Sequence, residues 1–161
     1  VHGGSVGEGG DISVGYDNWR KALEHVEDTG MRVLVENTAG GKNSVARYMD
    51  SIERLWEVIG HLNVGLCLDT CHTWAGGIPT IDAVKGFKKL VKKIDLIHFN
   101  DSKDGFESSR DRHENLGKGK IPKEELEYVI KNAKTDIIVE TPNGPDAQKK
   151  DIAWIRRRLK K

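Results

Sequence analysis

The stretch GLCLDTCHTW, from Gly65 to Trp74, holds four side chains that could bind a metal ion: Cys67, Asp69, Cys71 and His72. Cysteine ligands would indicate a zinc ribbon, whereas carboxylate and imidazole ligands would indicate a hydrolytic metal centre. The chain has only these two cysteines, and no histidine pair at zinc-finger spacing follows them, so a closed structural zinc site is excluded. A disulfide across so short a spacing is disfavoured. We therefore interpret both cysteines as reduced, buried apolar side chains and expect the chemistry at Asp69 and His72.

Carboxylate and imidazole side chains recur at the carboxyl ends of short apolar runs. The run at 64–69 ends in Asp69, and three other runs carry such a residue at or near their ends. We call these four residues the strand-end group: Glu36, Asp69, His98 and Glu140. His2 would occupy the same position after a further strand at the start of the chain. Since the carboxyl ends of parallel strands share one face, these side chains are expected to converge as ligands for zinc or manganese.

A second set of ligand-type residues, the loop group, consists of His72, Asp111 and His113. His72 lies three residues after Asp69, and the other two belong to the sequence DRH. Residues two apart in an extended segment point to the same side, so Asp111 and His113 could bind one ion together. With His72 as the third ligand, the loop group would leave an open position, which is typical of a catalytic metal.

The elements that must position these residues alternate between helices and strands. Apolar residues at helical spacing predict helices over 16–28, 43–60, 80–93, 122–132 and 144–161. Nearly continuous apolar runs predict parallel strands, buried on both faces, within 32–37, 64–69, 94–101 and 136–140. Residues 102–121 are expected to form a long loop, and a loop of that length in a compact domain is usually functional. The fold class is therefore α/β with parallel strands.

Composition restricts the class of protein further. The 161 residues suffice for one domain, and the formal net charge of +1 gives no electrostatic argument for binding nucleic acid or a membrane surface. No apolar run approaches the ~20 residues that a membrane span requires. No signal peptide opens the chain, so a cytoplasmic location is expected. The chain begins at Val1 rather than at Met, and we expect an upstream part of the protein to precede it.

Four motifs, in this order, resemble the endonuclease IV-type apurinic/apyrimidinic endonucleases of the xylose isomerase-like TIM barrel superfamily: VENTAG, GLCLDTCHTWAGG, IHFNDSKDGFESSRDRHENLGKGKI and VETP. The opening HGGS is similar to the family's histidine motif after its fourth strand. The resemblance covers essentially the whole chain, and it implies a (β/α)8 barrel that binds three zinc ions. Because such a barrel needs about 250 residues, residues 1–161 are expected to form a single, partial TIM-barrel domain. This domain would contain about five β/α units and lack the first three.

The resemblance implies an activity and a role for each matching residue. The family cleaves DNA on the 5′ side of abasic sites and trims blocked 3′ ends. The zinc ligands that it implies are His2, Glu36, Asp69, His72, His98, Asp111, His113 and Glu140. Glu36 would bridge the first and second ions, His2 would bind the first, and the loop group would hold the third. Glu36 or Glu140 could also orient the nucleophile, and Arg112 is either a phosphate contact or part of a salt bridge within the loop. Mn²⁺ could replace zinc.

The expected partner is double-stranded DNA that contains abasic sites, and no membrane partner is expected. We expect a monomer if the barrel is complete, and an oligomer if the chain is a genuine half-barrel, because open strand edges invite pairing. Two alternatives remain open. A sugar isomerase or epimerase of the same superfamily would use a single divalent ion in the strand-end group and would not need the loop group. A truncated barrel could also bind metal or damaged DNA without cutting it.

Overall fold

The parallel sheet predicted from the apolar runs is present in the computed structural model of the chain, which describes residues 1–160. The strands lie in the order β1 (Val33–Glu36), β2 (Val64–Asp69), β3 (Leu96–His98) and β6 (Asp136–Ile138). Every neighbouring pair is parallel. Strands that follow one another along the chain are neighbours in the sheet, as in a β/α barrel.

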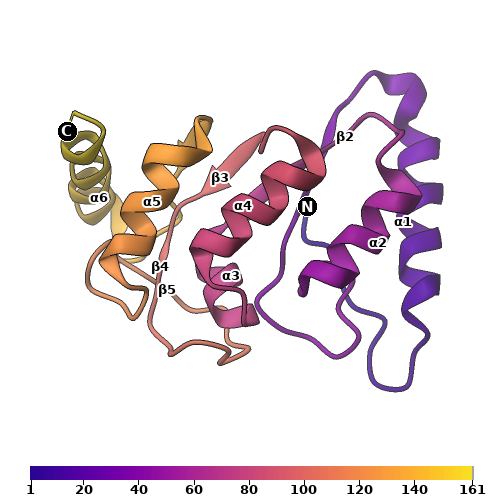
Figure 1. Ribbon diagram of the computed structural model, residues 1–161, viewed down its shortest axis with the longest axis horizontal. Coiled ribbons are helices and arrows are strands. Elements are labelled where there is room, and N and C mark those ends of the chain that lie inside the picture. The colour runs from indigo at the N-terminus through magenta and orange to yellow at the C-terminus, as the bar shows by residue number, and fades with distance from the viewer. Residues whose placement is uncertain (161) are drawn as a thin grey trace.

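A single layer of helices covers one face of this sheet (Figure 1). The helices are α1 (Ile12–Val26), α2 (Met49–Ile59), α4 (Thr80–Val91), α5 (Lys123–Ala133) and α6 (Gly144–Leu159). Successive helices of this layer pack side by side, from α1 to α6. The architecture is therefore an incomplete barrel, as the sequence predicted.

The main core lies between the helices and the sheet. Alternate strand residues such as Leu66, Leu68 and Ile97 are fully or almost fully buried there, together with Leu55 and Phe87 from the helices. The alternation of side chains along a strand turns the other residues to the opposite face. On that face, at the edge strand β6, Ile138 remains 48% exposed. The side of the sheet away from the helices is thus the less completely covered one.

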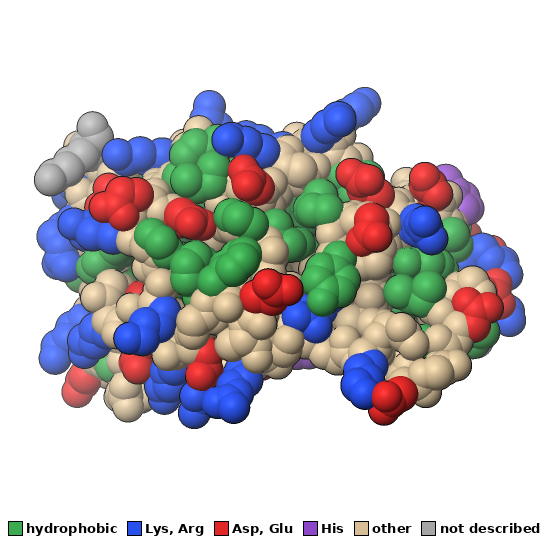
Figure 2. Space-filling view, turned by 60° about the horizontal axis from the view of Figure 1, so that its bottom comes forward, with side chains coloured by type: hydrophobic (Ala, Val, Ile, Leu, Met, Phe, Trp, Pro, Cys, Tyr) green, Lys and Arg blue, Asp and Glu red, His purple; other side chains and the backbone are tan. Residues whose placement is uncertain are grey.

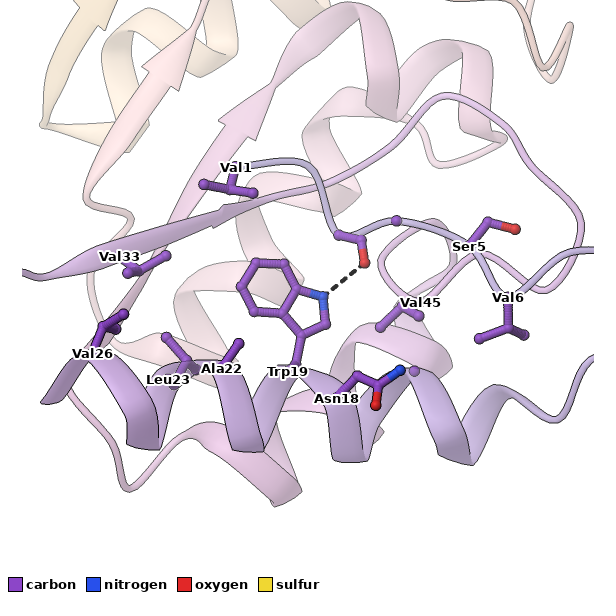
Figure 3. A pocket seen from close by; sticks show the side chains of 13 residues that line it. Val1, Ser5, Val6, Asn18, Trp19, Ala22, Leu23, Val26, Val33 and Val45 are labelled. Atoms are coloured by element: carbon purple, nitrogen blue, oxygen red, sulfur yellow. Dashed lines mark hydrogen bonds between the residues drawn. The ribbon is translucent and has the colours of Figure 1, made fainter.

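The N-terminal segment extends the sheet beyond β1. The Glu36 N–H donates to the Val1 carbonyl at 2.9 Å, the Gly3 N–H donates to the Glu36 carbonyl at 3.0 Å, and His2 forms a parallel bridge with Glu36. The expectation of a further strand entering at His2 therefore agrees with the pairing of these residues. A pocket of about 430 Å³ lies between this segment and α1, where Trp19 Nε1 donates to the Gly3 carbonyl at 2.7 Å (Figure 3).

The helix predicted over 43–60 begins six residues too early, since α2 starts at Met49. Residues 43–48 form a turn whose backbone groups bond to other segments. The Val45 N–H donates to the Gly4 carbonyl at 2.9 Å, and the Ala46 carbonyl accepts from the Thr38 N–H at 2.8 Å. Apolar residues in this turn continue the helical spacing of α2. Their backbone groups form hydrogen bonds to distant segments and not to one another, so no helix forms here.

Three further differences concern the start of one helix and two short elements. Helix α1 starts at Ile12 rather than at residue 16, because the Asp11 carboxylate caps it by accepting the Ser13 N–H at 2.9 Å. A short helix, α3 (Thr70–Gly76), follows β2 and was not predicted. The long loop contains a small antiparallel hairpin of β4 (Asp101–Ser102) and β5 (His113–Glu114). The last residue of the predicted helix 144–161 lies outside the described residues.

The described surface carries mixed charges. Lys and Arg side chains are interspersed with Asp and Glu side chains in Figure 2, and apolar side chains form a band across the middle of this face. Among residues 1–160, no helix combines the length and the apolar character that crossing a bilayer would require.

Candidate metal centre

The strand-end group comes together at the carboxyl edge of the sheet. Glu36, Asp69 and His98 are the last residues of β1, β2 and β3, and Glu140 follows two residues after the end of β6. One ligand atom from each of the four side chains lies within 4.8 Å of the others. The parallel register places these ends side by side, since Asp69 pairs with His98.

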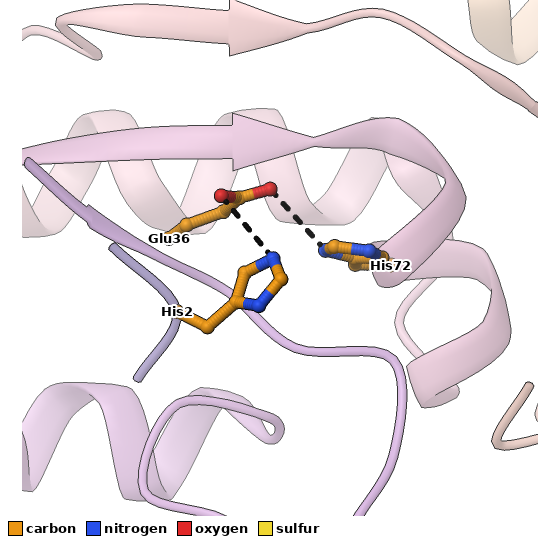
Figure 4. A group of neighbouring side chains, drawn as sticks. All are labelled: His2, Glu36 and His72. Atoms are coloured by element: carbon orange, nitrogen blue, oxygen red, sulfur yellow. Dashed lines mark ion pairs between the residues drawn. The ribbon is translucent and has the colours of Figure 1, made fainter. Parts of the chain in front are cut away.

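Glu36 lies at the centre of the cluster and is buried. Its Oε1 lies 3.0 Å from His98 Nδ1 and 3.4 Å from His72 Nδ1, and its Oε2 lies 3.5 Å from His2 Nε2. Figure 4 shows the His2 and His72 rings directed at the two carboxylate oxygens. Ligand atoms of His2, Glu36 and His72 are also close enough to hold one ion. A single carboxylate is thus shared between neighbouring candidate ion positions.

The loop group gathers around Asp111. Its Oδ1 lies 3.0 Å from His72 Nε2 and 3.2 Å from His113 Nε2. Both ring nitrogens are buried, and neither has a hydrogen-bond partner of acceptable geometry. Buried polar atoms are normally satisfied, and an ion shared with Asp111 would satisfy both. The residues present therefore fit a bound metal.

The other ring nitrogens are held by backbone carbonyls. His72 Nδ1 lies 2.9 Å from the Asn37 carbonyl, and His113 Nδ1 lies 3.3 Å from the Glu140 carbonyl. Such contacts fix the tautomer and ring orientation of histidine ligands. They leave Nε2 of each ring as the atom available to a metal.

Charges within the strand-end group favour a protonated histidine when no metal is bound. The Cys67 side chain and the hydrogen bond to Glu36 raise the pKa of His98 to about 10. Burial raises the pKa of Glu36, but His98 and the neighbouring histidines lower it further, so the carboxylate stays ionised. Burial raises the pKa of Asp69, which lies deepest in the cluster.

Neighbouring carboxylates also favour a protonated histidine in the loop group. Burial lowers the pKa of His72, but Asp111, Asp69 and Glu36 raise it more, to about 9. The adjacent His113 and His72 rings, when protonated, hold the pKa of Asp111 well below its usual range. Without a metal, the positive charge of the protonated histidines therefore offsets the negative charge of the carboxylates.

Both cysteines are free and buried, as the sequence analysis expected. The Cys67 sulfur lies among the ligand atoms of Glu36 and His98, a proximity that the sequence did not indicate. Burial raises the pKa of both thiols, that of Cys71 to about 12. Since the thiolate is the ligand form, the raised pKa favours packing over coordination.

The Arg112 guanidinium pairs with Asp104. Its Nε lies 2.7 Å from Asp104 Oδ2, and Nη2 pairs with Oδ1 of the same carboxylate. Of the two roles considered for Arg112, the salt bridge within the loop is the one that the structure contains.

A cavity of about 360 Å³ opens beside the ligands. His2, His72 and Asp111 line it, together with the glycine-containing segment 38–41 and Ser109. Glycine at position 40 is required by packing, because a Cβ there would overlap the Ser109 carbonyl. The cavity therefore gives a substrate access to His2 and to two members of the loop group, His72 and Asp111.

Sequence reasoning missed two buried asparagines that touch the ligands, Asn37 and Asn100. Asn37 directly follows Glu36, and Asn100 lies two residues after His98. Their place within the motifs VENTAG and IHFND was the available signal. Their amide contacts depend on other strands and could not be read from the sequence.

Comparison with known proteins assigns the chain to a family. The xylose isomerase-like TIM barrel family matches residues 1–158. "Probable endonuclease 4" of Mycobacterium tuberculosis (strain ATCC 25177 / H37Ra) is 49% identical over 158 residues, covering 98% of this chain and 62% of that protein. The protein of the same name from Mycobacterium ulcerans is 46% identical over 159 residues, with 99% and 62% covered. The chain thus spans about three fifths of the length of these curated relatives.

Solved structures agree on the fold. The crystal structure of endonuclease IV from Thermus thermophilus matches with a TM-score of 0.77 and 29% identity, covering 99% of this chain and 60% of that one. A D-tagatose 3-epimerase-like protein matches with a TM-score of 0.73 at 18% identity, over 99% of this chain and 61% of that one, which supports the fold alone. The chain therefore belongs to the xylose isomerase-like TIM barrel family.

Proposed function

We propose that the chain carries the zinc centre of a DNA endonuclease that hydrolyses the phosphodiester on the 5′ side of abasic sites in double-stranded DNA. The observation that carries the proposal is the loop group beside the strand-end group, because the two together provide ligands for more than one ion. The similarity to proteins named "Probable endonuclease 4" and to the Thermus thermophilus endonuclease IV supports the same activity.

Each ion position would use ligands already in contact. His2 and Glu36 belong to the first ion, the strand-end group to the second, and the loop group to the third, with zinc expected and Mn²⁺ as a substitute. When bound, the ions would activate water as a nucleophile and neutralise charge on the phosphate. Glu36 and Glu140 would accept hydrogen bonds from the attacking water and orient it.

The cavity beside His2, His72 and Asp111 would receive the sugar-phosphate backbone. Arg112 would contact a phosphate only after leaving Asp104, so we assign it to loop positioning. Removal of blocked 3′ ends is included in the proposal, because it breaks the same kind of phosphate ester bond. A cytoplasmic location is proposed as well, and the two unpaired cysteines support it.

The test combines metal content with cleavage. Elemental mass spectrometry of the dialysed chain should find two or more zinc ions, and an abasic duplex should be nicked. Asp111→Ala should lose one ion and the nicking activity. Asp82→Ala is the matched control, because it removes an exposed carboxylate on α4. If Asp111→Ala left metal content and cleavage at wild-type levels, the proposal would be wrong.

A single-metal sugar isomerase or epimerase is the second candidate. It is favoured by the strand-end group, whose four ligands could hold one ion without the loop group. One ion per chain, unaffected by Asp111→Ala, would support it. Retarded migration of an abasic duplex without nicking would instead indicate a fragment that binds DNA but does not cut it.

A further inference from the structure

One fully buried side chain contacts ligand residues from two different strands. Asn100 Nδ2 donates to Asp69 Oδ2 at 2.7 Å, and Asn100 Oδ1 accepts the Glu140 backbone N–H at 2.9 Å. Asn100 itself follows β3, which supplies His98. Its amide therefore lies between the ends of β2 and β6 and touches a ligand residue of each.

The orientation of this amide is determined by its partners. A backbone N–H can only donate, so the Glu140 N–H must face the amide oxygen. The NH₂ end then points at Asp69, which as a carboxylate can only accept. The Asn100 backbone is held as well, because its N–H donates to Thr70 Oγ1 at 2.9 Å and its carbonyl accepts the Thr70 hydroxyl at 2.6 Å.

These contacts leave the Asp69 carboxylate little freedom to rotate. Its Oδ1 accepts the His72 N–H at 2.8 Å, and its Oδ2 accepts from Asn100. The second bond is the one that turns the carboxylate toward the loop group, since Asp69 Oδ2 also lies 3.7 Å from His113 Nε2. Partners of this kind are known to set the geometry and affinity of metal ligands.

We infer that Asn100 is a positioning residue of the metal centre, whose amide holds the Asp69 carboxylate and the Glu140 backbone in the geometry that binds the ion. This inference rests on the proposed metal centre. Asn100 does not bind the ion in this assignment, and it acts through Asp69 and Glu140.

The chain offers a matched control in Asn37. This asparagine is also buried and also makes two amide contacts to Asp69, but both are to the backbone. Its Oδ1 accepts the Asp69 N–H at 2.8 Å, and its Nδ2 donates to the Asp69 carbonyl at 3.2 Å. Replacing either asparagine with Ala removes the same atoms and two hydrogen bonds, without changing the charge. Only Asn100→Ala frees the carboxylate.

The experiment compares Co²⁺ binding by the full chain and by the variants Asn100→Ala and Asn37→Ala. Visible absorption of bound Co²⁺ reports ligand geometry, and competition with a chromophoric chelator gives affinity. We expect Asn100→Ala to shift the Co²⁺ bands and to weaken binding about 10–100-fold. Asn37→Ala should keep the wild-type bands and lose less affinity than Asn100→Ala, because the Asp69 carboxylate keeps both of its hydrogen bonds. Circular dichroism establishes that each variant is folded, and Asn100→Ser replaces Asn100→Ala if the latter is not.

The outcomes separate the two proposals. If the wild-type chain binds no Co²⁺, the proposed metal centre fails and the role of Asn100 fails with it. If the wild type binds Co²⁺ and a folded Asn100 variant has the same bands and affinity, only the role of Asn100 is wrong. Equal losses in Asn100→Ala and Asn37→Ala would also contradict it. So would unfolding of both Asn100 variants, because Asn100 would then hold the fold rather than the ligands.

Discussion

At the scale of single residues, Glu36 joins the two ligand groups. Its carboxylate faces His98 of the strand-end group, His72 of the loop group, and His2 of the N-terminal segment. A buried carboxylate remains ionised only with such partners. In the proposed centre the metal ions would take the place of the protons now balancing this charge.

The cysteines give a direct test of which side chains near Glu36 are ligands. Replacing Cys67 and Cys71 together with Ala should leave the zinc content unchanged, because both buried thiols resist ionisation. Some loss of stability is expected from the smaller side chains, on the order of 1–2 kcal/mol in total. Elemental mass spectrometry and urea denaturation measure the two effects. Loss of an ion from the double variant would make a cysteine a ligand, either Cys67 beside Glu36 and His98 or Cys71 beside Asp69 and His113.

Metal binding should release protons. Without metal, the pKa values of His72 and His98 lie at about 9 and 10, above the ordinary 6.5 of an unfolded histidine. Metal ligands must be deprotonated, so at pH 7.5 the ions bound by the strand-end group and the loop group must displace protons, and their apparent affinity should rise with pH toward 9. Titration calorimetry in buffers of different ionisation enthalpy measures the protons released. Heats that do not depend on the buffer would contradict the expectation.

The same shifts predict the pH dependence of the metal-free chain. A folded-state pKa above the unfolded value means that the protonated histidines stabilise the fold below pH 6.5. This contribution should be lost as the pH rises through about 9 and 10. Urea denaturation of the chelator-treated chain across this range checks the sign.

At the scale of elements, the loop 102–121 is held by one buried carboxylate. Asp101 Oδ1 accepts the N–H groups of Ser102 and Ile121, and Oδ2 accepts those of Gly117 and Gly119, at 2.8–3.1 Å. Asp101, the first residue of β4, therefore holds the two ends of the loop together. This anchoring determines where the loop presents Asp111 and His113.

Weakening this anchor should affect stability and the loop group together. In Asp101→Asn an NH₂ would face backbone donors, so we expect a loss on the order of 3 kcal/mol and weaker binding of the ion assigned to the loop group. Gly119→Ala should act in the same direction, since a Cβ there would overlap Asp101 Oδ1 and the Ser102 carbonyl. Urea denaturation and zinc content measure both effects. Asp82→Asn, on the exposed surface of α4, is the control and should change neither.

At the scale of the whole molecule, the sheet has open edges. Among residues 1–160, β6 pairs with β3 alone, and at the opposite edge β1 is paired on its outer side by the short N-terminal segment. The pocket beside Trp19 opens at that second edge (Figure 3). Unpaired strand edges with exposed apolar side chains favour association.

We therefore expect the 161-residue chain to self-associate through these edges as its concentration rises. Ile138→Lys, which places a charge on β6 where Ile138 is 48% exposed, should reduce this association. Ile152→Lys is the control, because Ile152 is 39% exposed but lies on a helix, α6, and not on a strand edge. Sedimentation velocity at several concentrations distinguishes the variants. Equal behaviour of the two would exclude the β6 edge as the contact.

The sequence by itself determined the alternation of strands and helices and the family, and it predicted which side chains would meet at the carboxyl edge of the sheet. These predictions were possible because the end of an apolar run and a ligand-type residue can both be recognised within a few consecutive residues. The motifs then implied a β/α barrel through their resemblance to a known family.

Only the tertiary structure decided how these residues are held. The turn at 43–48, the anchoring of the loop by Asp101, the closeness of Cys67 to Glu36, and the amide of Asn100 between Asp69 and Glu140 all depend on other segments. Asn100 and Asp69 are 31 residues apart in the chain. A hydrogen bond between such residues leaves no periodic pattern in the sequence, because it exists only once the strands lie side by side.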